Sequence, residues 1–497
     1  MFNLLSLKPT PLPTDGTKTA DRVVPLHFFD DSPLWRSIIL YSLFVFDDIL
    51  EPEKLHSSLE RLIRKEGWWK LGARLRQNKT GALEYHIPSI FTEERPALAY
   101  SRVVHNTTVA EHPLASRLPR ASTKPAIVGN PDEFLDFIRP EGRPMKLGDY
   151  LNTDRPQLGL HIVSFRDATL VSLYWPHTLF DAMGKKALLD AWSLVLQGME
   201  DEVAAPHGSD VDPLVTLGTN ITEYHKLNTH RMGILGLIGY GLGQLGSFVR
   251  KKENRIVCVP FAFVQALRER VVADLASQEP TGAARIDEKG MQHPFLSEGD
   301  VLVAWWTRLV IAHLPPRSSQ TVVLNHAYCL RATLTPDLIP SNAPYVSNAV
   351  GFIPVMLRVS DILQNPTAYV ASSVRDAIVD LGNRPQVEAF SALIRESSAK
   401  MPPFFGNSNM HMITYSNWTK AKLFQVNFAA AVVQRDGVQT DKLHSGRPRY
   451  IQNNQFGLKL PNGFPIIGKD NYGNYWLSGY MMKGHWDHIE ELLAKAT

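Results

Sequence analysis

The chain alternates between two hydrophobic periodicities, one typical of strands and one typical of helices. Residues 36–46 form an apolar run that predicts a strand. Residues 51–67 carry three leucines at helical spacing and end in a glycine, which predicts an amphipathic helix. Residues 81–88 alternate like a strand, and residues 157–175 predict a hairpin. The first part of the chain therefore interleaves strands with helices.

The alternation of strands and helices is predicted again after a polar stretch in the middle of the chain. A helix is expected from about Asp181 to Gly198, and the polar residues 200–254 suit a crossover between two halves. The second half predicts, in order, a strand at 255–260, a helix at 261–276, a longer helix at 297–314 capped by Ser297, and a strand at 320–332. We therefore predict an α/β protein with an N-terminal domain over 1–200, a crossover segment over 201–254 and a C-terminal domain over 255–497, and a site at the domain interface.

Length and composition agree with two cores and disfavour several kinds of partner. At 497 residues, with 44% apolar and 20% charged residues, the chain exceeds what one hydrophobic core usually supports. The formal net charge is only +3 and no long basic block occurs, so nucleic-acid binding is not expected. A small neutral or mildly anionic ligand fits this balance better, and we expect a monomer.

The two cysteines and the two ends of the sequence indicate the cellular compartment in which the protein is expected. Cys258 and Cys329 lie in segments that resemble buried strands, which predicts inert core thiols and a reducing compartment. The first residues lack the basic region, long apolar stretch and cleavage site of a secretory signal. The last residues match no retention or peroxisomal address. These features predict a cytoplasmic protein.

One apolar segment is similar to a short membrane anchor. Residues 233–249 carry no charge and precede a basic run at 250–252. The segment is at the lower limit of a bilayer crossing, and its six glycines disfavour a helix. A literal G-x-G-x-x-G at Gly241, Gly243 and Gly246 lacks the preceding strand that a dinucleotide site requires. We expect a buried or channel-lining crossover segment, without membrane association.

His177 stands where a predicted strand ends and a predicted helix is about to begin, with Asp181 four residues further on. α/β proteins often place reactive groups at such junctions, because the sheet fixes their position while the loop exposes them. A neutral imidazole there can act as a general base near neutral pH. A single histidine can equally cap the helix or fill a gap in the core, so its position alone does not decide between catalysis and structure.

Other chemical motifs are weaker. His485, Asp487 and His488 offer zinc-type ligands, but no third histidine or cysteine lies nearby, so no metal is expected. The chain has no Gly-x-Ser-x-Gly elbow and no phosphate-binding loop, which disfavours hydrolase and kinase functions.

Several segments, in order along the chain, are similar to motifs of one enzyme family. Residues 177–181, HTLFD, resemble the His-x-x-x-Asp motif that BAHD acyltransferases share with chloramphenicol acetyltransferase and peptide-synthetase condensation domains. Residues 55–88 resemble the family's first helix and its Gly-Arg-Leu segment, with Ala73 inserted, and residues 295–310 resemble its second-half helix. Residues 325–351 resemble its Arg-bearing strand and Tyr-x-Gly-Asn turn. The fungal natural-product branch, which includes trichothecene O-acetyltransferases, is the nearest fit.

The resemblance implies two chloramphenicol-acetyltransferase-like α/β domains with a channel between them, which acyl-CoA and an acceptor enter from opposite ends. His177 would lie at the centre of the channel as general base. Asp181 would turn away from the substrate and pair with Arg331, as a brace for the loop that carries His177. An N-cap of the following helix remains an alternative role for Asp181.

Residues 414–431 resemble the family's Thr-Ser-Trp segment followed by its Asp-Phe-Gly-Trp-Gly motif. Ser416 falls where a polar side chain often faces the reacting carbonyl, so it could donate to the oxyanion, and an ordinary strand serine is the alternative. Trp418 and Asn348 are further candidates for contact with the oxyanion or the substrate.

The second of these motifs departs from the family pattern. Asn427-Phe428-Ala429-Ala430-Ala431 keeps only the phenylalanine, and the Asp-Gly of the first motif is Asp181-Ala182. In the family the motif's aspartate pairs with an arginine near the coenzyme A entrance, so Asn427 is expected to be a structural support. The loss of the charge and of both glycines leaves coenzyme A binding open to question.

These residues together predict an acyl-CoA-dependent acyltransferase that acts on a hydroxyl or amine of a small apolar secondary metabolite, with no permanently bound cofactor. One alternative is an enzyme of the same fold that has lost acyl transfer and catalyses cyclisation, isomerisation or elimination of a polyketide or terpenoid intermediate. A non-catalytic binding protein is another. Turnover with acetyl-CoA and a panel of alcohols would separate the first from the others.

Overall fold

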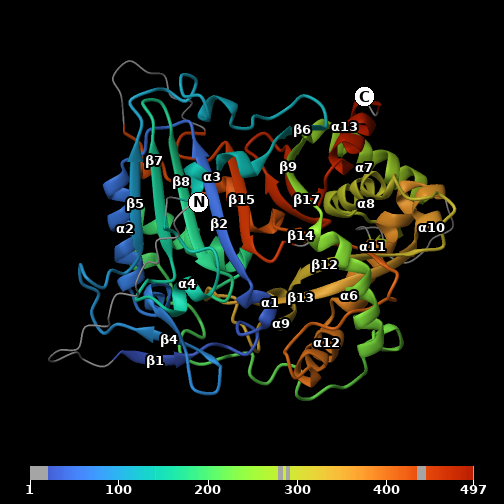
Figure 1. Ribbon diagram of the computed structural model, residues 1–497, viewed down its shortest axis with the longest axis horizontal. Helices are drawn as coiled ribbons and strands as arrows, with labels where there is room; N and C mark the ends of the chain where they lie inside the picture. Colours follow the sequence, from blue (N-terminus) through green and yellow to red (C-terminus); the bar gives the residue numbers. More distant parts are fainter. Residues whose placement is uncertain are drawn as a thin grey trace, which may run out of the picture.

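The computed structural model describes residues 21–139, 142–277, 284–286, 292–433, 444–459 and 461–495. Two large sheets occupy the two halves of the molecule, with helices on their outer sides (Figure 1). The α/β class predicted from the alternating periodicities is confirmed.

The first sheet has five strands in the order β15-β2-β8-β7-β5. Its central hairpin, β7 with β8, is the one predicted at residues 157–175, and every residue of both strands is buried. The five strands are β2 (Ile38–Phe46), β5 (Ala99–Val104), β7 (Gly159–Ser164), β8 (Thr169–Pro176) and β15 (Tyr450–Gly457). A separate three-stranded sheet contains β1 (Arg22–Pro25), β4 (Leu83–Ile87) and β3 (Arg74–Gln77).

The second sheet has seven strands in the order β13-β12-β14-β16-β17-β9-β6. Three neighbours at its centre, β12, β14 and β16, run parallel, and the other pairs are antiparallel. The strands are β6 (Ala126–Gly129), β9 (Lys252–Val259), β12 (Thr321–Cys329), β13 (Val350–Arg358), β14 (His411–Asn417), β16 (Gly463–Lys469) and β17 (Tyr475–Met482). Two short strands, β10 (Ala284–Ile286) and β11 (Gln292–Pro294), form a hairpin.

Each of the two large sheets includes one strand from the other half of the chain. β6, from the N-terminal half, pairs with β9 at the edge of the seven-stranded sheet. β15, from the C-terminal half, pairs with β2 at the edge of the five-stranded sheet. The predicted division into 1–200, 201–254 and 255–497 remains a proposal about domains, and the two sheets exchange strands across it.

Two long helices cover the first sheet and a helical layer covers the second. α2 (Pro52–Arg64) and α5 (Ala182–Leu196) pack on each other, and the Trp192 indole N–H donates to Ser58 Oγ at 2.9 Å. On the other half, α8 (Glu298–Ile311) packs against α7 (Phe261–Ala276), α11 (Thr367–Leu381) and α13 (His485–Lys495). The predicted Ser297 cap of α8 is confirmed, since Ser297 and Asp300 form a reciprocal capping box.

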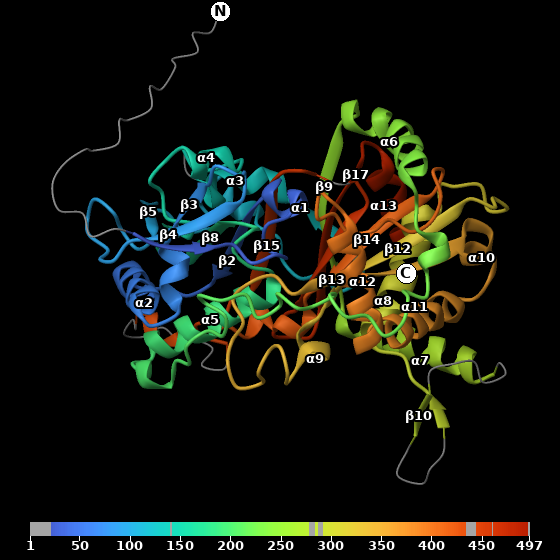
Figure 2. The same cartoon turned by 90° about the horizontal axis from the view of Figure 1, so that it is seen from below.

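The remaining α-helices of the described residues are α6 and α12, with 16 and 13 residues, and several of four to six residues. They are α1 (Pro33–Arg36), α3 (Leu135–Ile138), α4 (Gly148–Leu151), α6 (Ile234–Val249), α9 (Arg331–Leu334), α10 (Val359–Gln364) and α12 (Arg384–Glu396). α1 and α6 lie on the same side of the molecule (Figure 2).

Two expectations need correction. Residues 234–249 form helix α6 despite the glycines, and the helix is not buried, since a large part of its surface is exposed. One side of it does line a cavity, which was the other expected arrangement. Cys258 is buried in β9 as predicted, but Cys329 is only half-buried. In both places an apolar sequence pattern indicated burial, whereas the packing of distant elements decides what covers a surface.

Candidate active site

A cavity of about 610 Å³ lies between the two sheets. Strands of both sheets contribute to its wall, which is mostly apolar, together with α1, the start of α5 and one face of α6. Side chains that line it and are used below are Trp35, His177, Asp181, Lys185, Tyr240, Gln244, Cys329, His411, Ser416, Trp418, Lys420, Asn453 and Lys459. A cavity of this size and polarity suits a small organic ligand.

His177 is in the wall of this cavity, directly after β8. β8 ends at Pro176, and the His177 N–H then donates to the Ile38 carbonyl of β2 at 3.0 Å. Asn348 Nδ2 donates to the His177 carbonyl at 2.9 Å from the other half of the molecule. The imidazole stacks on Trp35, with ring centroids 4.1 Å apart. The backbone and the ring of His177 are therefore both held in place.

Burial in this wall lowers the pKa of His177 to about 4, because the charged imidazolium would lose its hydration. Asp181 and Asn348 act in the opposite direction without overcoming this effect. The imidazole is therefore neutral at pH 7, which is the form that can accept a proton. Nδ1 is buried and has no hydrogen-bond partner among the described residues.

Asp181 fills both roles that the sequence left open. As N-cap of α5, its Oδ1 accepts hydrogen bonds from the N–H groups of Met183 at 3.0 Å and Gly184 at 2.9 Å. Arg331 meets the same carboxylate with two parallel bonds of 2.8 and 2.9 Å, and the Ala349 N–H donates to Oδ2 at 2.9 Å. Burial raises the pKa of Asp181, but Arg331 and these bonds outweigh it, so the pKa is lowered.

Arg331 and Asn348 connect this carboxylate to the turn before β13. Arg331 Nη2 also donates to the carbonyls of Tyr345 at 3.0 Å and Ser347 at 2.8 Å. The Asn348 amide and its own backbone N–H both donate to Asp30 Oδ1, at 2.8 and 2.7 Å. Asn348 is thus engaged behind His177 and does not line the cavity.

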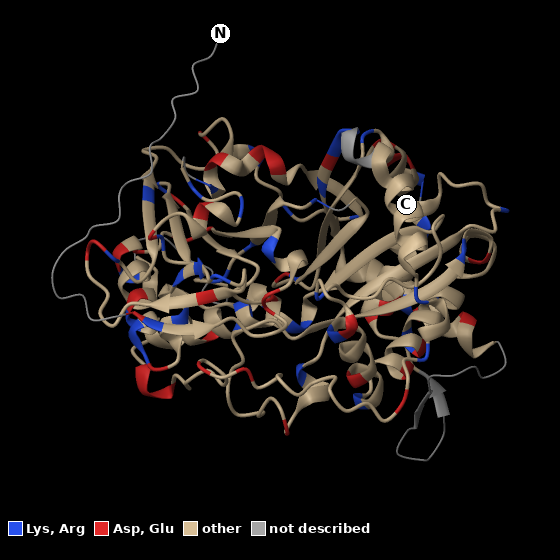
Figure 3. Ribbon diagram, turned by 60° about the horizontal axis from the view of Figure 1, so that its bottom comes forward, with Lys and Arg blue, Asp and Glu red and all other residues tan. Residues whose placement is uncertain are grey.

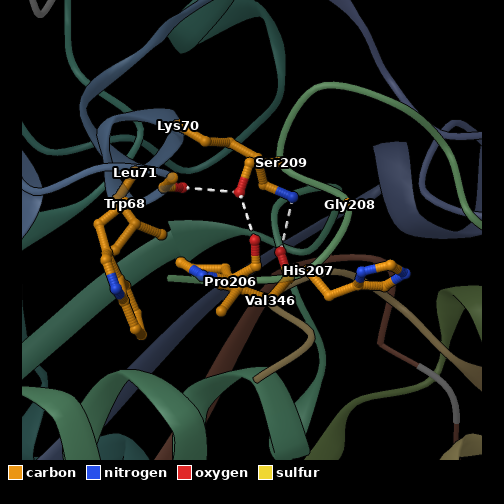
Figure 4. Close-up of a pocket in the computed structure, with 9 residues that line it drawn as sticks. Trp68, Lys70, Leu71, Pro206, His207, Gly208, Ser209 and Val346 are labelled. Carbon is orange, nitrogen blue, oxygen red and sulfur yellow. Dashed lines mark hydrogen bonds between the residues drawn. The ribbon is translucent and has the colours of Figure 1, made fainter. Parts of the chain in front are cut away.

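A buried lysine supports the same turn from the opposite side. Lys70 Nζ donates to the Val346 carbonyl at 2.6 Å (Figure 4). It also donates to Ser347 Oγ at 2.5 Å. Burial lowers the pKa of Lys70 and raises that of Asp30 to about 7. The small pocket around Lys70 in Figure 4 has no room for a water-sized molecule, so its polar groups serve the turn rather than a ligand.

Ser416 and Trp418 line the cavity from β14 and the residues that follow it. The Trp418 indole N–H donates to Ser416 Oγ at 2.7 Å, which leaves the Ser416 hydroxyl hydrogen available to another acceptor. Lys185, near the start of α5, points at the same tryptophan, with Nζ 4.7 Å from the ring centre. Its Nζ also donates to Ser42 Oγ at 3.0 Å and to Asn453 Oδ1 at 2.9 Å.

No protein-family model matches the chain, but full-length relatives exist. The chain is 36% identical to the acetyltransferase adrJ of Penicillium roqueforti over 97% of both proteins, and 38% identical to the acetyltransferase sphE of Aspergillus fumigatus over 96% of both. It is also 39% identical to calD of Penicillium decumbens, which is named a transcriptional regulator, over 99% of both.

Solved structures agree on the fold. TRI101 of F. sporotrichioides, in complex with coenzyme A and T-2, superposes with a TM-score of 0.68 at 16% identity, covering 95% of this chain and 98% of that one. Vinorine synthase superposes with a TM-score of 0.57 at 12% identity, covering 98% of this chain and 95% of that one. The chain belongs to the BAHD acyltransferases. It is an O-acyltransferase of this family, with the two-domain, chloramphenicol-acetyltransferase-like fold that the resemblance implied.

The segment that departs from the BAHD pattern lies outside this site. Asn427 is exposed, and its Oδ1 accepts a hydrogen bond only from the Ala429 N–H, at 2.9 Å, among the bonds of the described residues. Phe428, which the motif retains, is buried between Phe46 and Trp192. None of residues 427–431 lines the cavity. The structure therefore does not bring Asn427 together with the other predicted residues.

Three residues of the site had not been identified from the sequence. Lys185 lies four residues after Asp181, so helical spacing could have placed it on the same face of α5 as the N-cap. Asp30 and Lys70 have no comparable signal, because each reaches the site from a segment more than 100 residues away from its partners there.

The described part of the chain contains neither a metal-binding cluster nor a membrane-spanning helix. No group of three or more histidine, cysteine, aspartate or glutamate side chains is arranged to hold a metal ion. No helix there combines the length and the apolar character that crossing a membrane requires.

Proposed function

We propose that this protein transfers an acyl group from acyl-CoA to a hydroxyl, or an amine, of a small apolar secondary metabolite, with His177 as general base. The observation that carries the proposal is the position of His177, a neutral imidazole held from both halves of the chain in the wall of a large apolar cavity. A base is needed because a hydroxyl group attacks a thioester poorly while it keeps its proton.

In the proposed reaction the acceptor oxygen attacks the thioester carbon while His177 takes the hydroxyl proton. The tetrahedral intermediate then collapses, the carbon–sulfur bond breaks, and the imidazolium returns the proton to the departing thiolate. The products are an ester and free coenzyme A. Asp181 does not act on the imidazole in this scheme, because its oxygens are bonded to Arg331, Ala349 and the first turn of α5.

Ser416 is the proposed donor to the oxyanion. Its oxygen already accepts the Trp418 indole N–H, so its own hydrogen can point toward the reacting carbonyl in the cavity. A donor that is oriented before the reaction stabilises developing charge without reorganisation, which is why such groups contribute strongly to rate. Trp418 contributes here as the group that orients Ser416.

The charges of the cavity wall fit a polyanionic donor. The described lining residues include Lys420, Lys459 and Lys185, whose pKa burial lowers to about 7, and a single acid, Asp181, which Arg331 already neutralises. The structural neighbour TRI101 is described in complex with coenzyme A and a small-molecule acceptor. The excess positive charge and the apolar wall together support an acyl-CoA donor and an apolar acceptor.

The experiment is a calorimetric titration with acetyl-CoA, paired with mass spectrometry of reactions that contain acetyl-CoA and a panel of hydroxylated polyketides and terpenoids. We expect micromolar binding, about −8 kcal/mol, and a product heavier by one acetyl group. An absence of heat and of mass gain, with a panel compound converted to its isomer, would overturn the proposal in favour of the cyclisation or isomerisation alternative. An absence of both binding and any conversion would favour a binding protein.

A further inference from the structure

Helix α6 exposes an apolar face to solvent. Ile234, Leu235, Ile238, Leu242 and Leu245 are 74, 81, 54, 62 and 58% exposed. At 100° per residue these five positions fall within one stripe of about 100° along the helix. Soluble proteins rarely expose several large aliphatic side chains side by side, so such a patch marks a surface that binds something.

The other side of the same helix belongs to the cavity. Tyr240, Gly241 and Gln244 line the cavity wall, and Tyr240 packs near Phe404, with ring centroids 6.2 Å apart. α6 is therefore fixed to the protein by one side only, and it separates the cavity from the exposed apolar stripe. A ligand bound at the stripe would be one helix diameter from the cavity.

The charges around α6 indicate the kind of partner. Lys and Arg (blue) and Asp and Glu (red) are interspersed over the ribbon of the molecule in Figure 3. No Asp, Glu, Lys or Arg occurs between Ile234 and Val249, whereas Arg250 and Lys251, both exposed, follow directly. An uncharged apolar stripe beside a basic cluster matches the interior and the anionic headgroups of a bilayer surface. With 16 residues the helix is about 24 Å long, which is too short to span the hydrocarbon core and long enough to lie along it.

We propose that α6 docks the protein reversibly on the surface of a membrane that contains anionic lipid. The apolar stripe inserts among the acyl chains, Arg250 and Lys251 contact the headgroups, and the cavity-lining side of α6 stays with the protein. The cavity then lies one helix diameter from the lipid, which brings the site close to apolar small molecules dissolved in the bilayer. The sequence alone led to the opposite expectation, that the protein does not associate with membranes.

The test is flotation of the full-length protein with vesicles of phosphatidylcholine alone and of phosphatidylcholine with phosphatidylserine. We expect binding that is stronger on the anionic vesicles and falls at least tenfold in the variant Leu235→Ser/Leu242→Ser. The control Ile90→Ser/Val211→Ser replaces two residues outside α6 that are 69 and 73% exposed, and it should bind like the unmodified protein. Arg250→Gln/Lys251→Gln should remove only the preference for anionic vesicles.

Size-exclusion chromatography and thermal unfolding of the same variants keep the outcomes distinct. Equal melting temperatures show that lost flotation is not unfolding. Failure of the unmodified protein to float with either vesicle would overturn the proposal. A dimer of the unmodified protein that becomes monomeric in Leu235→Ser/Leu242→Ser, without flotation, would assign the stripe to a second copy of the chain instead. Because vesicle binding is measured without turnover, the result does not depend on the proposed acyl transfer.

Discussion

The loop that carries His177 and the segment 427–431 are two regions that the sequence relates to motifs of one family, yet they are held in different ways. The Asp181 carboxylate, beside His177, accepts hydrogen bonds from α5, from Arg331 and from Ala349, and so joins the two halves of the chain. Asn427 accepts a bond from a residue two positions away and has an exposed side chain.

This difference shows what each motif requires. A buried carboxylate that loses its cation remains charged and unpaired, so Asp181 and Arg331 depend on each other. An exposed turn can exchange its charge and its glycines for neutral residues at little cost, provided that the buried Phe428 keeps its contacts with Phe46 and Trp192. The departure from the family pattern at 427–431 therefore affects the periphery of the molecule rather than the cavity wall.

The largest effect is expected from His177→Ala. Loss of a general base typically lowers turnover about 10²- to 10⁴-fold, and the variant should unfold at nearly the same temperature. The measurement is kcat with acetyl-CoA and an acceptor identified from the panel. His411→Ala, which removes another histidine of the cavity wall, is the control and should lose far less activity. A His177→Ala enzyme with near-normal kcat would show that the His177 loop is no more important for catalysis than segment 427–431.

The next effect is on stability. Asp181→Asn or Arg331→Ala should cost about 3 to 5 kcal/mol of unfolding free energy, because each leaves a buried partner without compensation, and activity should fall as His177 loses its position. Chemical denaturation measures the change. The exposed pair of Arg384 with Asp337 is the control, and Asp337→Asn should cost no more than about 1 kcal/mol. If both pairs lost the same unfolding free energy, Asp181 and Arg331 would not be the buried support of the His177 loop.

Lys185 provides a further test of the cavity wall that carries His177. It is buried in this wall without an acidic partner among the described ion pairs. Burial lowers its pKa from 10.5 to about 7. Between these values the unfolded chain binds a proton that the folded protein does not, so this group makes stability rise with pH. Lys185→Met should therefore stabilise the protein most below pH 7, by up to about 5 kcal/mol, less the contribution of the hydrogen bonds lost to Ser42 and Asn453.

Melting temperatures of Lys185→Met and of the unmodified protein between pH 6 and 10 check this prediction. The gain should shrink steadily above pH 7 and vanish near pH 10. A gain that does not change with pH would mean that Lys185 keeps its ordinary pKa in the folded protein. Lys186→Met, on the same helix and paired with Asp190 at the surface, should show no such trend.

The smallest effect is expected at the peripheral region. Asn427→Ala should change the dissociation constant of acetyl-CoA less than about twofold and stability by no more than about 0.5 kcal/mol, as for an ordinary surface position. Phe428→Ala, in contrast, should cost about 3 to 5 kcal/mol, because it empties a buried aromatic site. A tenfold loss of acetyl-CoA affinity in Asn427→Ala would place this segment in the donor site after all.

Much of the fold was readable from the sequence. The period of apolar residues located the β7–β8 hairpin, α2, α5, α7, α8 and β12, and Ser297 marked the start of α8, because these features depend on residues close together in the chain. The motif at 177–181 and its resemblance to a family identified His177, Asp181 and Arg331 as a group, and the structure places Arg331 on Asp181.

Tertiary structure alone decided the rest. The exchange of β6 and β15 between the sheets, the support of Asn348 by Asp30 and of Val346 by Lys70, and the stacking of Trp35 on His177 all join residues more than 100 positions apart. Helix α6 likewise shows what the sequence alone could not determine. Its apolar residues and glycines are plain in the sequence, but local periodicity states only which side of an element is apolar. Which side of α6 lines the cavity and which side is exposed to solvent depends on how the surrounding helices and strands pack around it.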